Sequence, residues 1–349
     1  MSEYRTRLFE MDDCIDLPVA DVSARGWSAS LRGLTPNGII SGSEEFVTSS
    51  SRKHHYKYLL ETLEFSKNKL TNRYAPEIVI NARNRVSAQK ALNLIGAASA
   101  LLFASPTFDD AVAVPSDYQN PEGLLKHEIE HTLQSSNGTS GFWKATKIAA
   151  RATMKSTWKF AVAKYLASLK SSSVHPMDHH PHVGSRFDIE KDPVEIVKMA
   201  QSISLAYSVI EELGFEVRAS QTRPSKIGGK WNPIVLDDLK SRLSRSGLSW
   251  DEKFDWMIRG APKLIEKRQT PPSGTKTAWT RNRVRDRTVN IADAIGYASF
   301  LRSKASAHAS GTLTKHLTMV DVSNVQDLAR QLTLRVLGQS KQDAPLIVI

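Results

Sequence analysis

The chain of 349 residues contains a single cysteine, Cys14, and aromatic residues make up only 7% of it. One cysteine cannot form an internal disulfide, so we expect a protein of a reducing compartment, for which the cytoplasm is the best fit. The N-terminus has no apolar signal core, so we expect no targeting segment. These absences exclude a small secreted domain stabilised by disulfides.

The sequence also lacks a long hydrophobic run. Its most apolar stretch, Ala91 to Ala104, covers about 14 residues, whereas a helix needs roughly 20 apolar residues to cross a bilayer. We therefore expect a buried helix there and no membrane partner.

Acidic residues are fewer than basic ones. The chain has 47 Lys and Arg against 36 Asp and Glu, which gives a formal net charge of +11. Such an imbalance favours polyanionic partners, nucleic acid first and an anionic membrane second. The alternative is an ordinary solvated basic surface.

Helical periodicity dominates the chain, and alternating strand–helix units are absent, so the sequence predicts a mainly α protein and not a parallel α/β fold. Residues 1–50 are rich in Gly, Ser, Asp and Pro, and we expect loops and a small hairpin there. A continuous helical region is expected over about 142–169. We divide the chain into an α-rich N-terminal region with minor strand and loop content (1–120), a helical segment with a His-rich connecting loop (121–190), and a helical bundle (191–349).

Capping residues mark the helices of the C-terminal bundle. Helix starts are typically marked by Asp, Asn or Ser before Pro or Glu, and helix ends by Gly. On these signals we expect helices that begin at Asp192-Pro193, Asn232-Pro233 and Ser249-Trp250-Asp251-Glu252, helix ends at Gly214 and Gly247, and further helices over Ile291–Leu301 and Ser323–Gly338.

Two histidine groups match metal-ligand patterns. His127 and His131 form the H-E-x-x-H pattern of zinc hydrolases, and His179 and His182 belong to a Pro- and His-rich run. A charged helix turn explains the first group better, since no third ligand follows at a familiar spacing, and a connecting loop explains the second better, since two prolines favour an extended conformation. We expect no metal and no other cofactor.

Three further segments carry charge or glycine. Glu211 and Glu212 lie on one predicted helix but point about 100° apart, so we expect one of them to pair with a structural arginine. The segment Ser225–Trp231 lacks the order of a phosphate loop and predicts a tight turn with Trp231 packed against a neighbour. Four arginines that lead into the Ile291–Leu301 helix are candidates for gripping RNA phosphates: Arg281, Arg283, Arg285 and Arg287.

At the other end of that helix stand Arg302 and His308, six positions apart. Imidazole transfers protons near neutral pH and guanidinium binds phosphate, so the pair can cleave RNA without a metal. On a continuous helix the two side chains would lie roughly 120° apart. The helix must therefore end near His308, or a second copy must complete the site. In the alternative role, Arg302 pairs with an acidic residue and His308 caps the helix end.

The region of about Asp192–Gly338 resembles the HEPN superfamily. Two segments carry this resemblance, Ala206–Leu213 and Leu301–His308. The second is similar to that superfamily's Arg-x(4–6)-His motif. The residue after the arginine is often Asn, Asp or His in active members, and here it is Ser303. The resemblance implies a bundle of four or five helices and a metal-independent RNA endonuclease of toxin–antitoxin or anti-phage defence.

In that resemblance Arg302 and His308 are the catalytic residues, and Ser303 and Lys304 contact RNA beside them. It also implies a homodimer in which two motifs face each other, and an antitoxin or other defence protein as a possible partner. Two alternatives stay open. One is a catalytically inactive module that binds RNA or protein, and the other is a zinc-dependent hydrolase built on His127 and His131.

Overall fold

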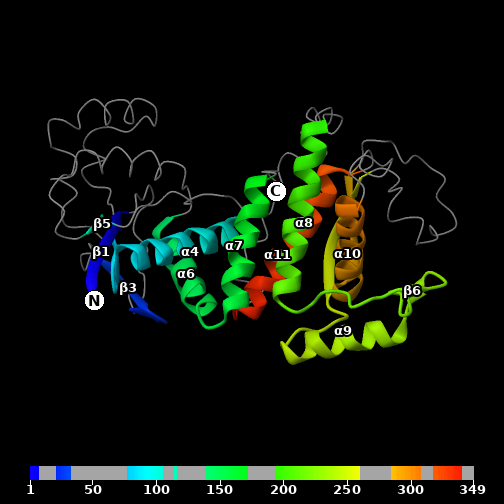
Figure 1. Cartoon of the computed structure of the whole chain (residues 1–349), viewed down its shortest axis with the longest axis horizontal. Helices are drawn as coiled ribbons and strands as arrows, with labels where there is room; N and C mark the ends of the chain where they lie inside the picture. Colours follow the sequence, from blue (N-terminus) through cyan, green and yellow to red (C-terminus); the bar gives the residue numbers. More distant parts are fainter. Residues whose placement is uncertain are drawn as a thin grey trace. The chain divides into compact units, whose positions relative to one another are not determined.

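The computed structural model describes residues 1–7, 21–32, 77–104, 114–115, 138–171, 193–259, 284–307 and 317–339. These fall in two compact units, Met1–Ser156 and Thr157–Ile349 (Figure 1). The mainly α prediction is confirmed, since the described residues form seven helices and mostly short strands. The expected region boundaries at 120 and 190 lie outside the described residues.

The first unit contains a five-stranded antiparallel sheet with the strand order β2-β3-β4-β1-β5. Strands β2 and β3 form a hairpin whose turn includes Gly26 at a φ of 90°, which glycine adopts without steric cost. The β-prone pieces that suggested a hairpin in the sequence, residues 38–40 and 46–48, lie outside the described residues. The sequence did not indicate the rest of the sheet, because it joins distant parts of the chain. The strands are β1 (Ser2–Arg7), β2 (Val22–Ala24), β3 (Trp27–Arg32), β4 (Glu77–Ala82) and β5 (Val114–Pro115).

Helix α4 (Arg85–Phe103) contains the apolar stretch predicted to be buried, and that prediction is confirmed. Asn84 caps the helix, with its side-chain oxygen accepting the Ser87 backbone N–H at 2.9 Å. The helix is longer than the apolar run, so by length and composition alone it could cross a membrane. Within the unit 61% of its most apolar window is buried, as in many core helices, and it packs against helix α6.

The helical region expected over 142–169 is two helices, α6 (Gly138–Ala152) and α7 (Ser156–Ser171). The prediction of a continuous helix was therefore wrong at residues 153–155. There the Thr153 hydroxyl donates to the Ala150 carbonyl at 2.6 Å. Such local side-chain bonds compete with the backbone bonds of a helix, and the boundary between the two units follows this break.

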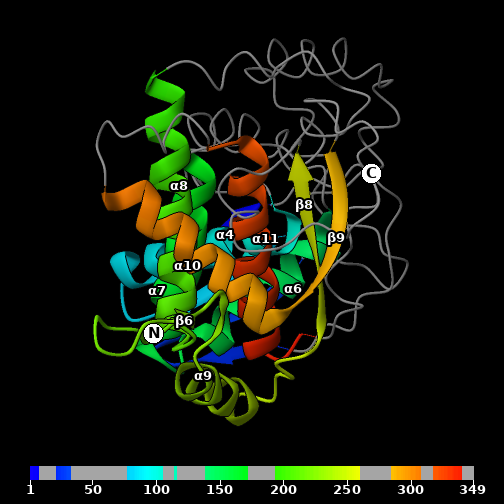
Figure 2. The same ribbon diagram turned by 90° about the vertical axis from the view of Figure 1, so that its right-hand side faces the viewer.

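The second unit is built around helix α8, which packs against both α10 and α11 (Figure 2). The predicted helix ends at Gly214 and Gly247 are confirmed, with φ values of 81° and 75°. After α7 the elements of this unit are α8 (Pro193–Glu212), β6 (Lys226–Ile227), β7 (Lys230–Trp231), α9 (Pro233–Arg245), β8 (Lys253–Arg259), β9 (Val284–Asn290), α10 (Ile291–Ala307) and α11 (Met319–Val336).

A buried polar contact fixes three of these helices to one another. Ser168 of α7 and Ser202 of α8 exchange hydrogen bonds through their hydroxyls and carbonyls at 2.8–3.0 Å. The Gln326 amide of α11 donates to both serine hydroxyls, at 3.0 and 2.8 Å. Because these buried groups satisfy one another, they restrict how the three helices can pack.

One prediction for the C-terminal bundle was wrong. The capping pattern Ser249–Glu252 opens no helix, and strand β8 follows it. Buried Phe254 and Trp256 alternate there with exposed Lys253 and Asp255, and this period of two is that of a strand. The arginine run leads into α10 as expected, and the described part of the run, residues 284–287, lies on strand β9, antiparallel to β8. The bundle therefore includes an antiparallel pair of strands.

Candidate functional site

The helices α8 and α10 bring together the two segments that carry the family resemblance. On α8, Tyr207 and Glu211 are four residues apart, so they lie on one face of the helix. From α10, an Arg302 guanidinium nitrogen lies 3.3 Å from the Glu211 carboxylate. The centre of the same guanidinium lies 5.6 Å from the centroid of the Tyr207 ring. Arg302 is thus positioned by a carboxylate and an aromatic ring of one neighbouring helix.

This contact confirms that one carboxylate of the Glu211–Glu212 pair has an arginine partner. Glu212 bonds instead to Lys164 of α7, at 2.7 Å. The adjacent carboxylates therefore face different helices, as their 100° separation on α8 predicts. The same ion pair is the contact expected in the alternative role of Arg302, as the partner of an acidic residue.

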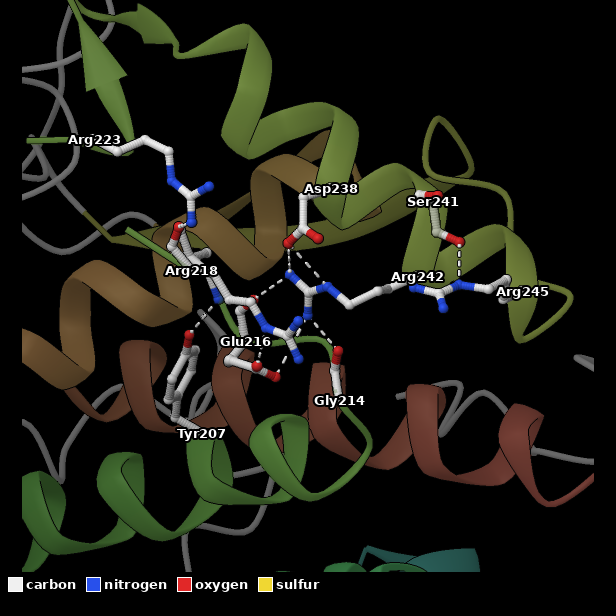
Figure 3. Close-up of polar contacts among 10 residues, drawn as sticks. Tyr207, Gly214, Glu216, Arg218, Arg223, Asp238, Ser241, Arg242 and Arg245 are labelled. Carbon is white, nitrogen blue, oxygen red and sulfur yellow. Dashed lines mark hydrogen bonds and ion pairs between the residues drawn. The ribbon is translucent and has the colours of Figure 1, made fainter. Parts of the chain in front are cut away.

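Tyr207 forms the inner wall of the site. Its side chain is buried, and its hydroxyl oxygen accepts the backbone N–H of Val217 at 3.1 Å (Figure 3). Burial raises the pKa of the Tyr207 phenol, and contacts with the Ser299 side chain and the Val217 backbone oppose the shift in part. The ring is therefore neutral at physiological pH, and its face can attract the guanidinium.

Arg302 remains accessible from the other side. Its side chain is 45% exposed. A guanidinium has five N–H donors in a planar fork that matches the oxygens of phosphate. The arrangement can therefore hold an arginine in a set orientation while a phosphate approaches from solvent.

Ser303 and Lys304 lie next to Arg302 on α10, but each contacts its own helix. The Ser303 hydroxyl donates to the Phe300 carbonyl at 2.8 Å. The Lys304 ammonium lies 5.6 Å from the centroid of the Phe300 ring. Their predicted contacts with RNA stay predictions.

His308 follows the last described residue of α10 and lies outside the described residues, so its position relative to Arg302 stays a prediction. Arg281 and Arg283 lie outside them too, whereas Arg285 and Arg287 lie on β9, opposite Ile258 and Trp256 of β8. The metal-ligand candidates His127, His131, His179 and His182 are all outside the described residues. Within the described ranges, no group of three His, Cys, Asp or Glu residues is arranged to hold a metal ion.

A buried arginine that the sequence reading missed supports this site. Arg242 of α9 donates to Asp238 at 2.8 Å and to the Glu216 carbonyl at 2.7 Å, and it also bonds to the Gly214 carbonyl (Figure 3). It thereby fixes the turn after α8, from which Val217 reaches Tyr207. The four-residue spacing of Asp238 and Arg242 on a helix was a sequence signal for this pair.

Comparison with protein-family models, curated proteins and solved structures finds no match for this chain.

Proposed function

We propose that this protein is a metal-independent RNA endonuclease of the HEPN type, with Arg302 and His308 as its catalytic residues. The observation that carries the proposal is the contact of Arg302 with Glu211 and Tyr207. It joins the two segments that carry the resemblance, and it orients a half-exposed guanidinium six residues before His308 in the sequence. The net charge of +11 supports a polyanionic substrate.

In the proposed reaction His308 removes the proton of a ribose 2′-hydroxyl, and the oxygen attacks the adjacent phosphorus. The 5′-oxygen of the next nucleotide leaves and takes up a proton, so the products are a 2′,3′-cyclic phosphate and a 5′-hydroxyl. Arg302 stabilises the negative charge that develops on the pentavalent phosphate. If His308 lies around the helix from Arg302, a second copy supplies the missing group, and the active species is a homodimer.

The test is an RNase assay in the presence of EDTA, with the parent protein, Arg302→Ala and His308→Ala. We expect cleavage by the parent to survive EDTA and each substitution to slow it by about 100-fold or more, and we expect cyclic-phosphate ends on the products. An unimpaired His308→Ala protein would show that the site is wrong.

The ion pair of Arg302 favours a second candidate, a catalytically inactive module that binds RNA. In such a module the Arg302 guanidinium stays paired with the Glu211 carboxylate when RNA binds, and this ion pair holds α8 and α10 together. This candidate predicts that RNA binds without being cut, and that Arg302→Ala destabilises the fold without changing any RNA product.

A further inference from the structure

Between α8 and α9 the chain crosses a strongly basic segment, residues 217–231, which we call the basic segment. It contains four cations and no acidic residue. Residues 218–224 and 227–230 are all exposed. The cations are Arg218, Arg223, Lys226 and Lys230.

The basic segment is fixed at both ends to the helices that form the candidate site. At its start, Val217 bonds to Tyr207, the residue whose ring contacts Arg302. At its end, the Trp231 indole N–H donates to Asp293 of α10 at 2.7 Å. Trp231 also lies so close to Gly296 that a side chain there would collide with its ring. The predicted packing of Trp231 against a neighbour is thus confirmed.

The segment is also ordered between these anchors. Ser220 and Arg223 close a turn through mutual backbone hydrogen bonds at 2.9 and 3.2 Å. The hairpin β6–β7 turns through Gly228 and Gly229, both at positive φ, where glycine is favoured. A pre-ordered surface loses less conformational entropy when a ligand binds.

Two of the cations are well placed for phosphate. The Arg223 guanidinium donates to the Arg218 carbonyl at 3.2 Å, which sets its direction (Figure 3). In the part of the chain that the structure describes, neither Arg223 nor Lys230 forms an ion pair with a carboxylate. Between Lys226 and the hairpin turn, the side chain of Ile227 is exposed. Cations can contact the phosphates of a nucleic-acid strand, and an exposed apolar side chain beside them can pack against its bases.

We propose that the basic segment binds the sugar–phosphate backbone of single-stranded RNA and leads it to the Arg302 site. This inference rests on the proposed function, because it assigns RNA to the same site. Its test measures binding apart from cleavage, so that one can fail without the other.

The probe is a fluorescein-labelled 2′-O-methyl oligouridine of about 20 nucleotides, which the proposed reaction cannot cleave because the nucleophile is methylated. Anisotropy titrations at several salt concentrations compare the full-length parent with Arg223→Gln/Lys230→Gln. The matched control is Lys159→Gln/Lys253→Gln, which removes two exposed cations of the same unit and lowers the formal net charge equally, from +11 to +9 (11 − 2). Thermal unfolding by circular dichroism checks that all three proteins fold alike.

We expect the Arg223/Lys230 variant to bind about tenfold more weakly and the slope of log K against log salt to fall by about 1.4, because each lost single-strand phosphate contact contributes about 0.7. The control should change far less. Equal weakening of both variants, no weakening of either, or binding of phosphatidylserine vesicles without binding of the oligonucleotide would each overturn the inference. Binding through the basic segment without any cleavage of unmodified RNA would instead sustain this inference and remove the proposed reaction.

Discussion

Two arginines of the second unit, Arg242 and Arg302, have opposite surroundings. The Arg242 side chain is 6% exposed. It is held by the Asp238 carboxylate of its own helix and by the Gly214 and Glu216 carbonyls of the turn after α8. The Arg302 side chain is 45% exposed and contacts one carboxylate and the face of one ring. Both are anchored near the same end of α8, yet only Arg302 can be approached from solvent.

The difference separates an arginine whose donors are used inside the protein from one whose side chain is open to a ligand. A buried arginine must have its donors satisfied inside the protein, and removal of its contacts leaves buried groups unpaired. A half-exposed arginine contributes little to folding, because water screens its ion pair. The predictions below test this division.

The largest expected effect is that of Arg302→Ala on RNA cleavage. Loss of a donor that stabilises charge in the transition state typically costs about 100- to 1000-fold in rate. The free energy of unfolding should change by only about 0.5 kcal/mol, as for other exposed ion pairs. Cleavage kinetics and urea unfolding on the same preparation check both numbers. Arg302→Lys is the control for charge without the planar fork, and it should recover only part of the activity.

Arg242→Met should have the reverse profile. It leaves Asp238 and two carbonyls near the α8 turn without their donor, so we expect the free energy of unfolding to fall by about 3 kcal/mol. Arg245→Met, three residues further along α9, is the matched control, because Arg245 is exposed and, among the described residues, bonds to the Ser241 carbonyl alone. That control should change stability by less than about 0.5 kcal/mol. Equal melting curves for the two variants would contradict the assignment of Arg242 as a structural anchor.

The sequence predicted the helices well where their ends carry capping chemistry. Asn232 before Pro233 and glycine at Gly214 mark boundaries that the structure confirms. The prediction failed at Ser249–Glu252, because a four-residue capping pattern also fits a turn. The alternation of buried and exposed residues that marks the strand, with Phe254 and Trp256 buried, begins only after this pattern. A local pattern indicates where an element begins or ends, but it does not decide whether a helix or a strand follows.

The candidate site was predictable only in part. Arg302 stands out through its spacing to His308, and the acidic pair on α8 predicts an arginine partner. Which arginine that is depends on how α10 packs against α8, and this follows from burial along both helices, not from any local pattern. The role of Tyr207 as the wall behind Arg302 has the same origin.

A smaller effect is expected from Glu211→Gln. The substitution keeps the shape but removes the charge that orients Arg302, so we expect cleavage to slow about threefold to tenfold, or about 0.6–1.4 kcal/mol in activation free energy. Glu212→Gln is the matched control, since it removes the same charge one position along, where the partner is Lys164. Cleavage should distinguish the two variants clearly. If Glu211→Gln instead cleaves faster than the parent, the carboxylate competes with the substrate and does not position the arginine.

The smallest effect concerns Tyr207→Phe, which removes the acceptor of the Val217 N–H but keeps the ring under Arg302. At neutral pH we expect a loss of about 1 kcal/mol in the free energy of unfolding, the usual contribution of one hydrogen bond. Because the pKa of Tyr207 is raised in the folded state, its neutral form stabilises the fold fully below the ordinary tyrosine pKa of about 10. That contribution is lost as the pH rises through the folded-state pKa. Urea unfolding at about pH 9 and pH 11 should therefore show a steeper alkaline loss of stability in the parent than in Tyr207→Phe. Parallel losses in the two proteins would mean that the phenol is not held neutral behind Arg302.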